Sequence, residues 1–76
     1  MARYANLGGN SSIIEYIIGD DYIDVKFSDG SMYRYSYRSA GYAKVNEMKR
    51  LAVAGQGLNS YIMRHARFNY ERKSSR

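Results

Sequence analysis

The chain has 76 residues, a formal net charge of +5, no cysteine and one histidine. This length holds a single domain with a thin core, and the composition excludes both disulfides and a zinc site made from cysteine and histidine. All apolar runs in the sequence are short, so no segment is apolar enough to span a bilayer. We therefore expect one domain over residues 1–76, with an ordered part over about 11–70 and flexible ends.

Three β-strands are expected in the first half of the chain. Isoleucine and tyrosine dominate residues 12–18, a composition that favours a strand. Gly-Asp-Asp at 19–21 then indicates a turn. Apolar and charged residues alternate over 22–27, which predicts a strand with one buried face. After Ser-Asp-Gly at 28–30, residues 32–38 alternate again and predict a third strand that ends at residue 37.

The turn between the second and third strands decides their register. A two-residue loop would place Val25 and Arg34 on the same face and mix apolar with charged side chains. A three-residue loop over 28–30, with Gly30 left-handed in a G1 bulge, keeps the apolar residues together. Because a one-residue slip moves every side chain to the other face, we expect the three-residue loop. The expected pairs are Val25 with Tyr33 and Ile23 with Tyr35, which leaves Asp24, Lys26, Arg34, Ser36 and Arg38 on the outer face.

The second half of the chain has helical periodicity. Ser39 is expected to cap a helix from Ala40 to Ala54. Glycines at 55 and 57 end it, and a shorter helix follows from residue 58. The expected fold class is α+β, a three-stranded antiparallel meander with the main helix and the shorter C-terminal helix packed on one face. The apolar stripe of the main helix is Tyr42, Val45, Met48, Leu51 and Ala52. The residues expected to be largely buried are Val25, Phe27, Tyr35, Val45, Leu51 and Ile62.

Charge is distributed unevenly along the chain. Residues 1–30 hold two basic and five acidic residues, a balance of −3, whereas residues 31–76 hold ten basic and two acidic residues, a balance of +8. This asymmetry fits either an ordinary solvated basic surface or a surface that binds an anionic partner. The predicted basic clusters are Lys26, Arg34 and Arg38 on the outer sheet face, and Arg64, Arg67, Arg72, Lys73 and Arg76 along the last helix and tail.

The chain contains nine tyrosines but no pattern typical of an active site. Tyr33 and Tyr35 are expected to pack in the core, with a stacking platform for nucleic-acid bases as the functional alternative. Tyr4 and Tyr70, near the ends, are freer to contact a partner. His65 lies beside arginines on a helix and reads as a surface residue. Since no catalytic, metal-binding or phosphate-loop pattern is present, we expect no enzyme activity and no cofactor.

The stretch from Ser11 to about Tyr70 resembles the KTSC domain, a short domain found alone in bacteria and phages and at the C-terminus of some lysyl-tRNA synthetase-like proteins. The most specific part is a Phe-x-x-Gly-x-x-Tyr-x-Tyr pattern from Phe27 to Tyr35. The chain departs from the family in having no proline. The resemblance implies an RNA-related role, by analogy with the synthetase association. Other matching residues are Ser12, Val25, Lys26, Asp29, Ala54, Gly55, Gly57, Leu58, Asn59 and Ile62.

These observations predict a small non-enzymatic binding module whose partner is nucleic acid, RNA in particular, bound through the basic helix and tail. The alternative is a protein-binding module such as a phage-encoded inhibitor of a host protein, because tyrosine and arginine are also enriched at protein interfaces. With no signal-peptide pattern, we expect a cytoplasmic protein, in the host cytoplasm if a phage encodes it. We expect no membrane contact and no small-molecule substrate. The candidate binding residues are Arg64, Arg67, Arg72, Lys73, Lys26, Arg34, Arg38 and Tyr70.

Overall fold

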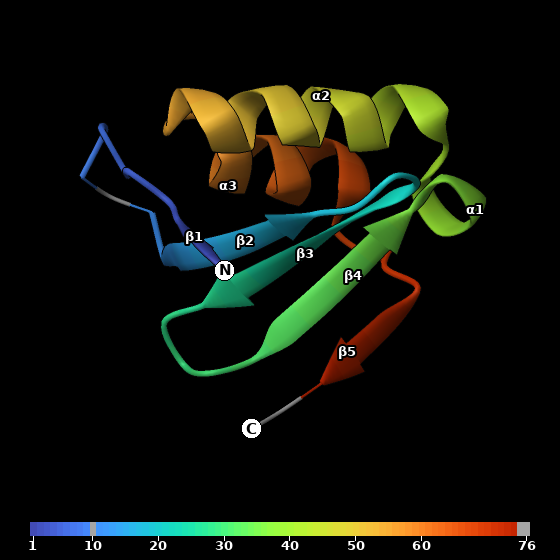
Figure 1. Cartoon of the computed structure of the whole chain (residues 1–76), viewed down its shortest axis with the longest axis horizontal. Helices are drawn as coiled ribbons and strands as arrows, with labels where there is room; N and C mark the ends of the chain where they lie inside the picture. Colours follow the sequence, from blue (N-terminus) through green and yellow to red (C-terminus); the bar gives the residue numbers. More distant parts are fainter. Residues whose placement is uncertain (10, 75–76) are drawn as a thin grey trace.

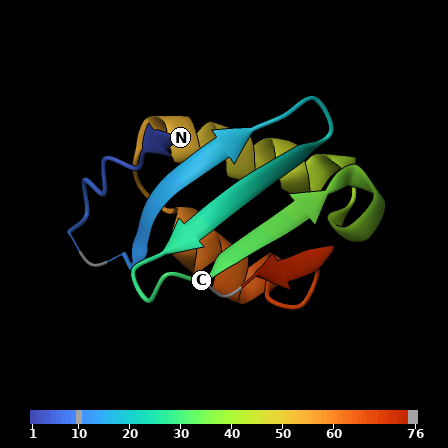
Figure 2. The ribbon, with the colours of Figure 1, turned by 60° about the horizontal axis from the view of Figure 1, so that its bottom comes forward.

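The computed structural model describes residues 1–9 and 11–74 as an antiparallel sheet covered on one side by helices. The sheet has five strands in sequence order, β1 (Ala2–Arg3), β2 (Ile13–Ile18), β3 (Tyr22–Phe27), β4 (Met32–Ser36) and β5 (Arg72–Ser74). The helices are α1 (Tyr37–Ala40), α2 (Tyr42–Ala54), α3 (Leu58–Tyr61) and the π-helical turn η1 (Ile62–Ala66). Figure 1 shows α2 and α3 above the sheet, and Figure 2 shows its other face without a covering helix. The α+β class is confirmed, and the sheet has two strands more than the expected three.

The β3–β4 hairpin has the predicted register. Val25 pairs with Tyr33 and Ile23 with Tyr35. The Phe27 N–H donates to the Ser31 carbonyl, and the Phe27 carbonyl accepts from the Gly30 N–H, each over 2.9 Å. Gly30 has φ = 91°, the left-handed conformation that a G1 bulge requires. The three-residue loop is therefore confirmed.

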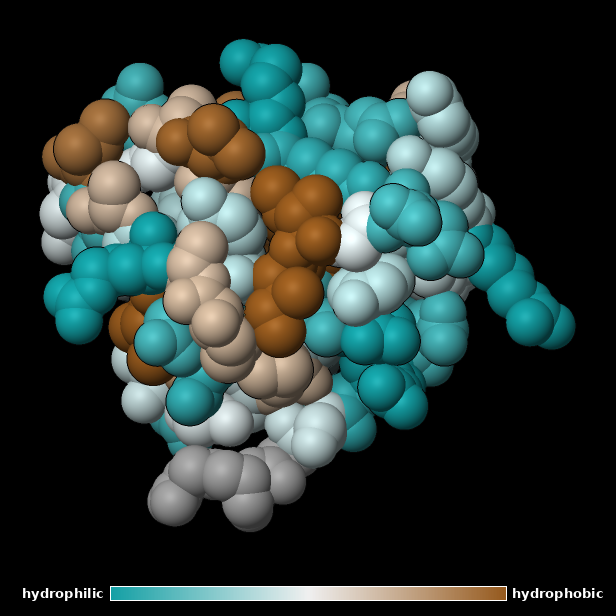
Figure 3. Space-filling model, viewed as in Figure 1, coloured by the Kyte–Doolittle hydropathy of each residue, from teal (hydrophilic) through white to brown (hydrophobic). Residues whose placement is uncertain are grey.

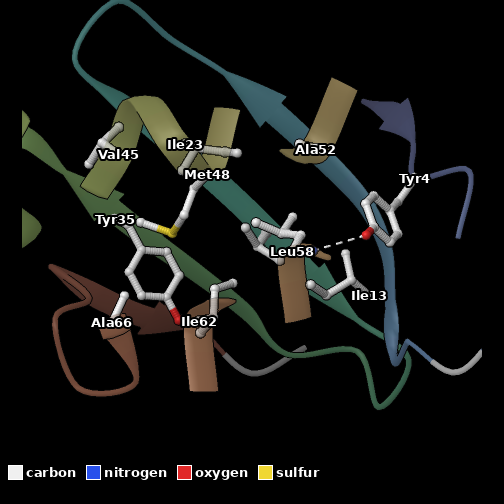
Figure 4. Packing of buried hydrophobic residues seen from close by; sticks show 11 residues of the cluster. Tyr4, Ile13, Ile23, Tyr35, Val45, Met48, Ala52, Leu58, Ile62 and Ala66 are labelled. Carbon is white, nitrogen blue, oxygen red and sulfur yellow. Dashed lines mark hydrogen bonds between the residues drawn. The ribbon is translucent and has the colours of Figure 1, made fainter. Parts of the chain in front are cut away.

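Both chain ends were expected to be flexible, and parts of them form the edge strands β1 and β5. β1 pairs with β2 at one edge of the sheet, and β5 pairs with β4 at the other. Tyr4, expected to be free for a partner, is only 4% exposed. Its hydroxyl accepts a hydrogen bond of 3.2 Å from the Leu58 N–H, drawn in Figure 4. The N-terminal segment thus closes one end of the core.

The junction between sheet and helices differs from its prediction. β4 ends at Ser36, not at Tyr37, because Ser36 and Ser39 form a capping box for α1. The Ser39 N–H donates to Ser36 Oγ and the Ser36 N–H donates to Ser39 Oγ, both over 3.1 Å. Gly41, with φ = 92°, then separates α1 from α2. Ser39 is therefore not the cap of the main helix, and Arg38 lies on α1 and not on a strand.

The core lies between the inner face of the sheet and the helices. Figure 4 shows Tyr35 packed among side chains of α2 and of the α3–η1 segment. Phe27 and Leu51, expected to be largely buried, are only partly buried at its margin. Tyr42 was placed in the apolar stripe of the main helix, but it is 68% exposed and packs against Tyr37 at a centroid distance of 4.8 Å. The fully buried side chains include Ile13, Ile23, Val25, Tyr35, Val45, Met48, Leu58 and Ile62.

Large apolar side chains are also present at the surface, spread over several elements. Figure 3 shows apolar side chains on one face, some of them adjoining in a brown band near the centre and others isolated among hydrophilic side chains. Apolar side chains are common at the surface of folded domains. Within residues 1–9 and 11–74, no helix has the length and apolar character needed to cross a membrane.

Candidate nucleic-acid interface

An aromatic hollow of about 320 Å³ lies where the β3–β4 hairpin meets the chain that follows η1. We call it the aromatic groove. Its apolar lining consists of Phe27, Tyr33, Tyr35, Met63, Phe68 and Tyr70, and its polar lining of Asp29, Ser31 and Arg67. Two segments that are distant in sequence, residues 27–35 and 63–70, therefore form one concave surface.

Tyr33 is the centre of the aromatic contacts in this groove. Its ring meets Phe27 edge-on at a centroid distance of 5.4 Å and Tyr70 edge-on at 5.0 Å. It also lies nearly parallel to Tyr35, at 6.4 Å and an interplanar angle of 15°. Aromatic pairs prefer these edge-to-face and offset arrangements, so the rings form a fixed wall. Tyr35 lines the groove and is only 1% exposed, and this burial raises the pKa of its phenol.

Phe68 is the most exposed large apolar residue among those described, at 79%. The short segment that carries it is held at both ends. The Asn69 N–H donates to the Ala66 carbonyl over 2.9 Å, and Lys44 Nζ donates to Asn69 Oδ1 over 3.0 Å. The phenyl ring is thus presented to solvent by an anchored turn.

Two cations flank the aromatic side chains. The Arg67 guanidinium carbon lies 5.3 Å from the centroid of the Phe68 ring. Lys73 pairs with Tyr33 across β4 and β5, and its ammonium nitrogen lies 5.5 Å from the centroid of that ring. Of the eight residues predicted to bind a partner, Arg67 and Tyr70 line the aromatic groove, and Lys73 borders it through its contact with the Tyr33 ring.

The remaining predicted residues lie elsewhere. Arg72 pairs with Arg34 in the sheet, so both side chains belong to the outer face, which also carries Lys26. Arg64 is exposed on η1, and Arg38 on α1. The expected helix-and-tail cluster is divided by β5, because successive residues of a strand point to opposite faces. Arg76 lies outside the residues that the structure describes.

The outer face carries charge of both signs. Lys26 Nζ lies 3.8 Å from a carboxylate oxygen of Glu15. Arg34 forms two hydrogen bonds to Asp24, of 2.7 Å from Nε and 2.9 Å from Nη2. The hydrogen bonds to Asp24 raise the pKa of the Arg34 guanidinium, so this side chain stays charged. Arg3 also belongs to the outer face, because it pairs with Glu15, which pairs with Lys26. Lys26 and Arg34 are thus paired with acidic residues, whereas Arg3 and Arg72 make no ion pair within the described part of the chain.

Sequence reasoning missed Phe27, Met63 and Phe68 as members of a binding surface. Nothing in the sequence marks Phe27 or Met63 as a binding residue, since both occur in elements that were predicted to pack in the core. Phe68 has a weak signal, because it is a lone aromatic residue next to arginine in a polar stretch. Its neighbours in space became apparent only once β5 was placed beside β4.

Comparisons of this chain with family models, with curated protein sequences and with solved structures find no match. The resemblance to the KTSC domain stays a prediction, and the candidate site is interpreted from its own geometry.

Proposed function

We propose that this protein is a non-enzymatic module that binds single-stranded RNA, with bases stacked in the aromatic groove and phosphates near Arg67 and Lys73. One observation carries the proposal, namely that the solvent-exposed ring of Phe68 shares a groove with Tyr33 and Tyr70, and that two cations flank these rings.

The chemistry of the groove favours a ligand that is both aromatic and anionic. Bases stack on exposed aromatic side chains, and each stacked base contributes about 1–3 kcal/mol to binding. Lys73 and Arg67 repel a cationic ligand and attract phosphates. RNA is recognised mainly through unpaired bases that proteins stack on aromatic rings. The resemblance to the KTSC domain, with its synthetase association, supports RNA over DNA by analogy.

The test compares two exposed aromatic residues. We expect Phe68→Ala to weaken binding of a fluorescently labelled single-stranded oligoribonucleotide roughly tenfold or more, as measured by anisotropy at low salt. Tyr42→Ala is the matched control, because Tyr42 is 68% exposed but lies on α2 and does not line the groove. We expect this control to bind as the unmodified protein does.

Two results would overturn the proposal. One is the absence of oligoribonucleotide binding at low salt, despite the net charge of +5. The other is an equal loss of affinity in both variants. A stoichiometric protein complex that survives nuclease would instead favour the protein-binding alternative.

A further inference from the structure

Two arginines lie directly opposite each other on the outer face of the sheet. Arg34 of β4 and Arg72 of β5 are cross-strand partners. Like charges in directly opposite positions destabilise a sheet. Both residues line a hollow of about 430 Å³, which is also lined by Asp24, Met32, Lys73 and Ser74. Asp24 already compensates the charge of Arg34 in part, and an anion bound in this hollow would compensate that of Arg72.

The Arg34 side chain is already oriented toward a ligand. One edge of its guanidinium binds Asp24 through Nε and Nη2. One face stacks on Tyr22, with 3.9 Å from the guanidinium carbon to the ring centroid. The second edge, formed by Nη1 and the other N–H of Nη2, has no acceptor among the hydrogen bonds of the described residues. A guanidinium edge of this kind binds two oxygens of a phosphate or carboxylate at once.

The acidic residues nearby do not supply the missing anion. Asp24 is only 6% exposed, and both of its carboxylate oxygens already accept from Arg34. The Glu71 N–H donates to the Arg34 carbonyl over 2.6 Å, but the Glu71 carboxylate forms no ion pair with Arg34 or Arg72 within the described chain. Arg72 is exposed, and its guanidinium donates no hydrogen bond to another described residue.

We propose that Arg34 and Arg72 form a binding site for a phosphate group, on the sheet face opposite the aromatic groove. A tetrahedral dianion has enough oxygens to accept from both guanidinium groups, which a single carboxylate lacks once Arg34 holds it at two points. The phosphate is that of a free phosphate monoester or of a nucleic-acid backbone. This site goes beyond the proposed function, because neither Arg34 nor Arg72 lines the aromatic groove, although Lys73 borders both hollows.

The test is a titration of ¹⁵N-labelled protein with inorganic phosphate, followed by NMR at constant ionic strength. We expect saturable shifts of the Arg34 and Arg72 signals, including their side-chain Nε–H groups. Arg72→Gln should weaken phosphate binding about tenfold or more, because charge-assisted hydrogen bonds are lost. Arg3→Gln removes the same charge from the outer face at the opposite edge of the sheet, and it should change the dissociation constant by no more than about twofold.

A second variant probes Arg34 itself. Arg34→Lys keeps a positive charge beside Asp24 but removes the free guanidinium edge, so it should also weaken phosphate binding. If this variant fails to fold, Arg72→Gln alone tests the phosphate site, since Arg72 is exposed and its substitution leaves the core intact. Shifts that do not saturate, or equal losses in Arg72→Gln and Arg3→Gln, would overturn the proposal.

Two further arms separate the sources of the phosphate and the two proposed sites. A single-stranded oligonucleotide that displaces inorganic phosphate from Arg34 would identify a backbone phosphate as the ligand. Oligonucleotide binding without displacement would identify a free phosphate monoester. Phe68→Ala must retain phosphate binding in either case, so failure of the aromatic groove to bind RNA is distinguishable from failure of this site.

Discussion

Gly30 shows how one residue sets the register of the sheet. Its φ of 91° is a conformation in which a β-carbon is penalised. We expect Gly30→Ala to lower the free energy of unfolding by about 1 kcal/mol or more, measured by urea denaturation. Gly8→Ala is the control, because Gly8 lies outside the left-handed region and an added β-carbon there has no atom within 4 Å. An unchanged midpoint for Gly30→Ala would contradict the bulged turn.

The stability of the fold depends on pH through the buried phenol of Tyr35. Burial is the main cause that raises the pKa of its phenol, so the folded chain holds a proton that the unfolded chain releases above about pH 10. The resulting contribution to stability is complete below about pH 10 and is lost as the pH rises further. We expect the stability of Tyr35→Phe to fall less steeply than that of the unmodified protein between about pH 9 and 11. Equal slopes in chemical denaturation would show that this phenol is not protected.

At the scale of elements, the sequence was most informative where a pattern was long. The strands at 22–27 and 32–36 alternate over several residues and were predicted with their register. β1 and β5 have two and three residues, all exposed, so neither has an apolar pattern to recognise. They are strands because an edge of the sheet was open to pair with them, which is a property of the fold rather than of local sequence. For the same reason the aromatic groove could not be predicted.

The start of α1 is a second place where the alternating pattern did not predict the structure. Ser36 lies in β4, as the alternation predicts, but it also forms a capping box with Ser39, so Tyr37 begins α1 and does not extend the strand. We expect Ser36→Ala to lower the free energy of unfolding by about 1 kcal/mol, because the cap of α1 is lost. Ser60→Ala, at an exposed position in α3, should leave it nearly unchanged. Equal stabilities of the two variants would mean that this cap does not stabilise the fold.

At the scale of the whole molecule, β5 joins two surfaces of different character. Lys73 approaches Tyr33 on the side of the aromatic groove, while Arg72 lies beside Arg34 on the outer face. The basic second half of the chain is therefore not one patch. It is distributed over both sides of a sheet edge, with Arg67 and Lys73 beside the aromatic rings and Arg34 and Arg72 on the outer face.

This arrangement predicts how RNA binding depends on salt. Each phosphate neutralised on a single strand contributes about 0.7 to the slope of log affinity against log salt concentration. We expect Arg67→Gln combined with Lys73→Gln to reduce that slope by about 1.4. The pair Arg3→Gln and Arg50→Gln removes the same charge outside the aromatic groove and should reduce it less. If both double variants reduced the salt slope equally, RNA would be attracted by the overall charge of the protein and not by Arg67 and Lys73 in particular.

The central claim, that single-stranded RNA lies in the aromatic groove, is tested most directly by mapping where it touches the protein. We would titrate ¹⁵N-labelled protein with a short oligoribonucleotide and follow the backbone amides by NMR. The account predicts saturable shifts centred on Tyr33, Arg67, Phe68, Tyr70 and Lys73, and little change at Tyr42. An absence of shifts, or shifts centred on α2 with the groove residues unaffected, would contradict it.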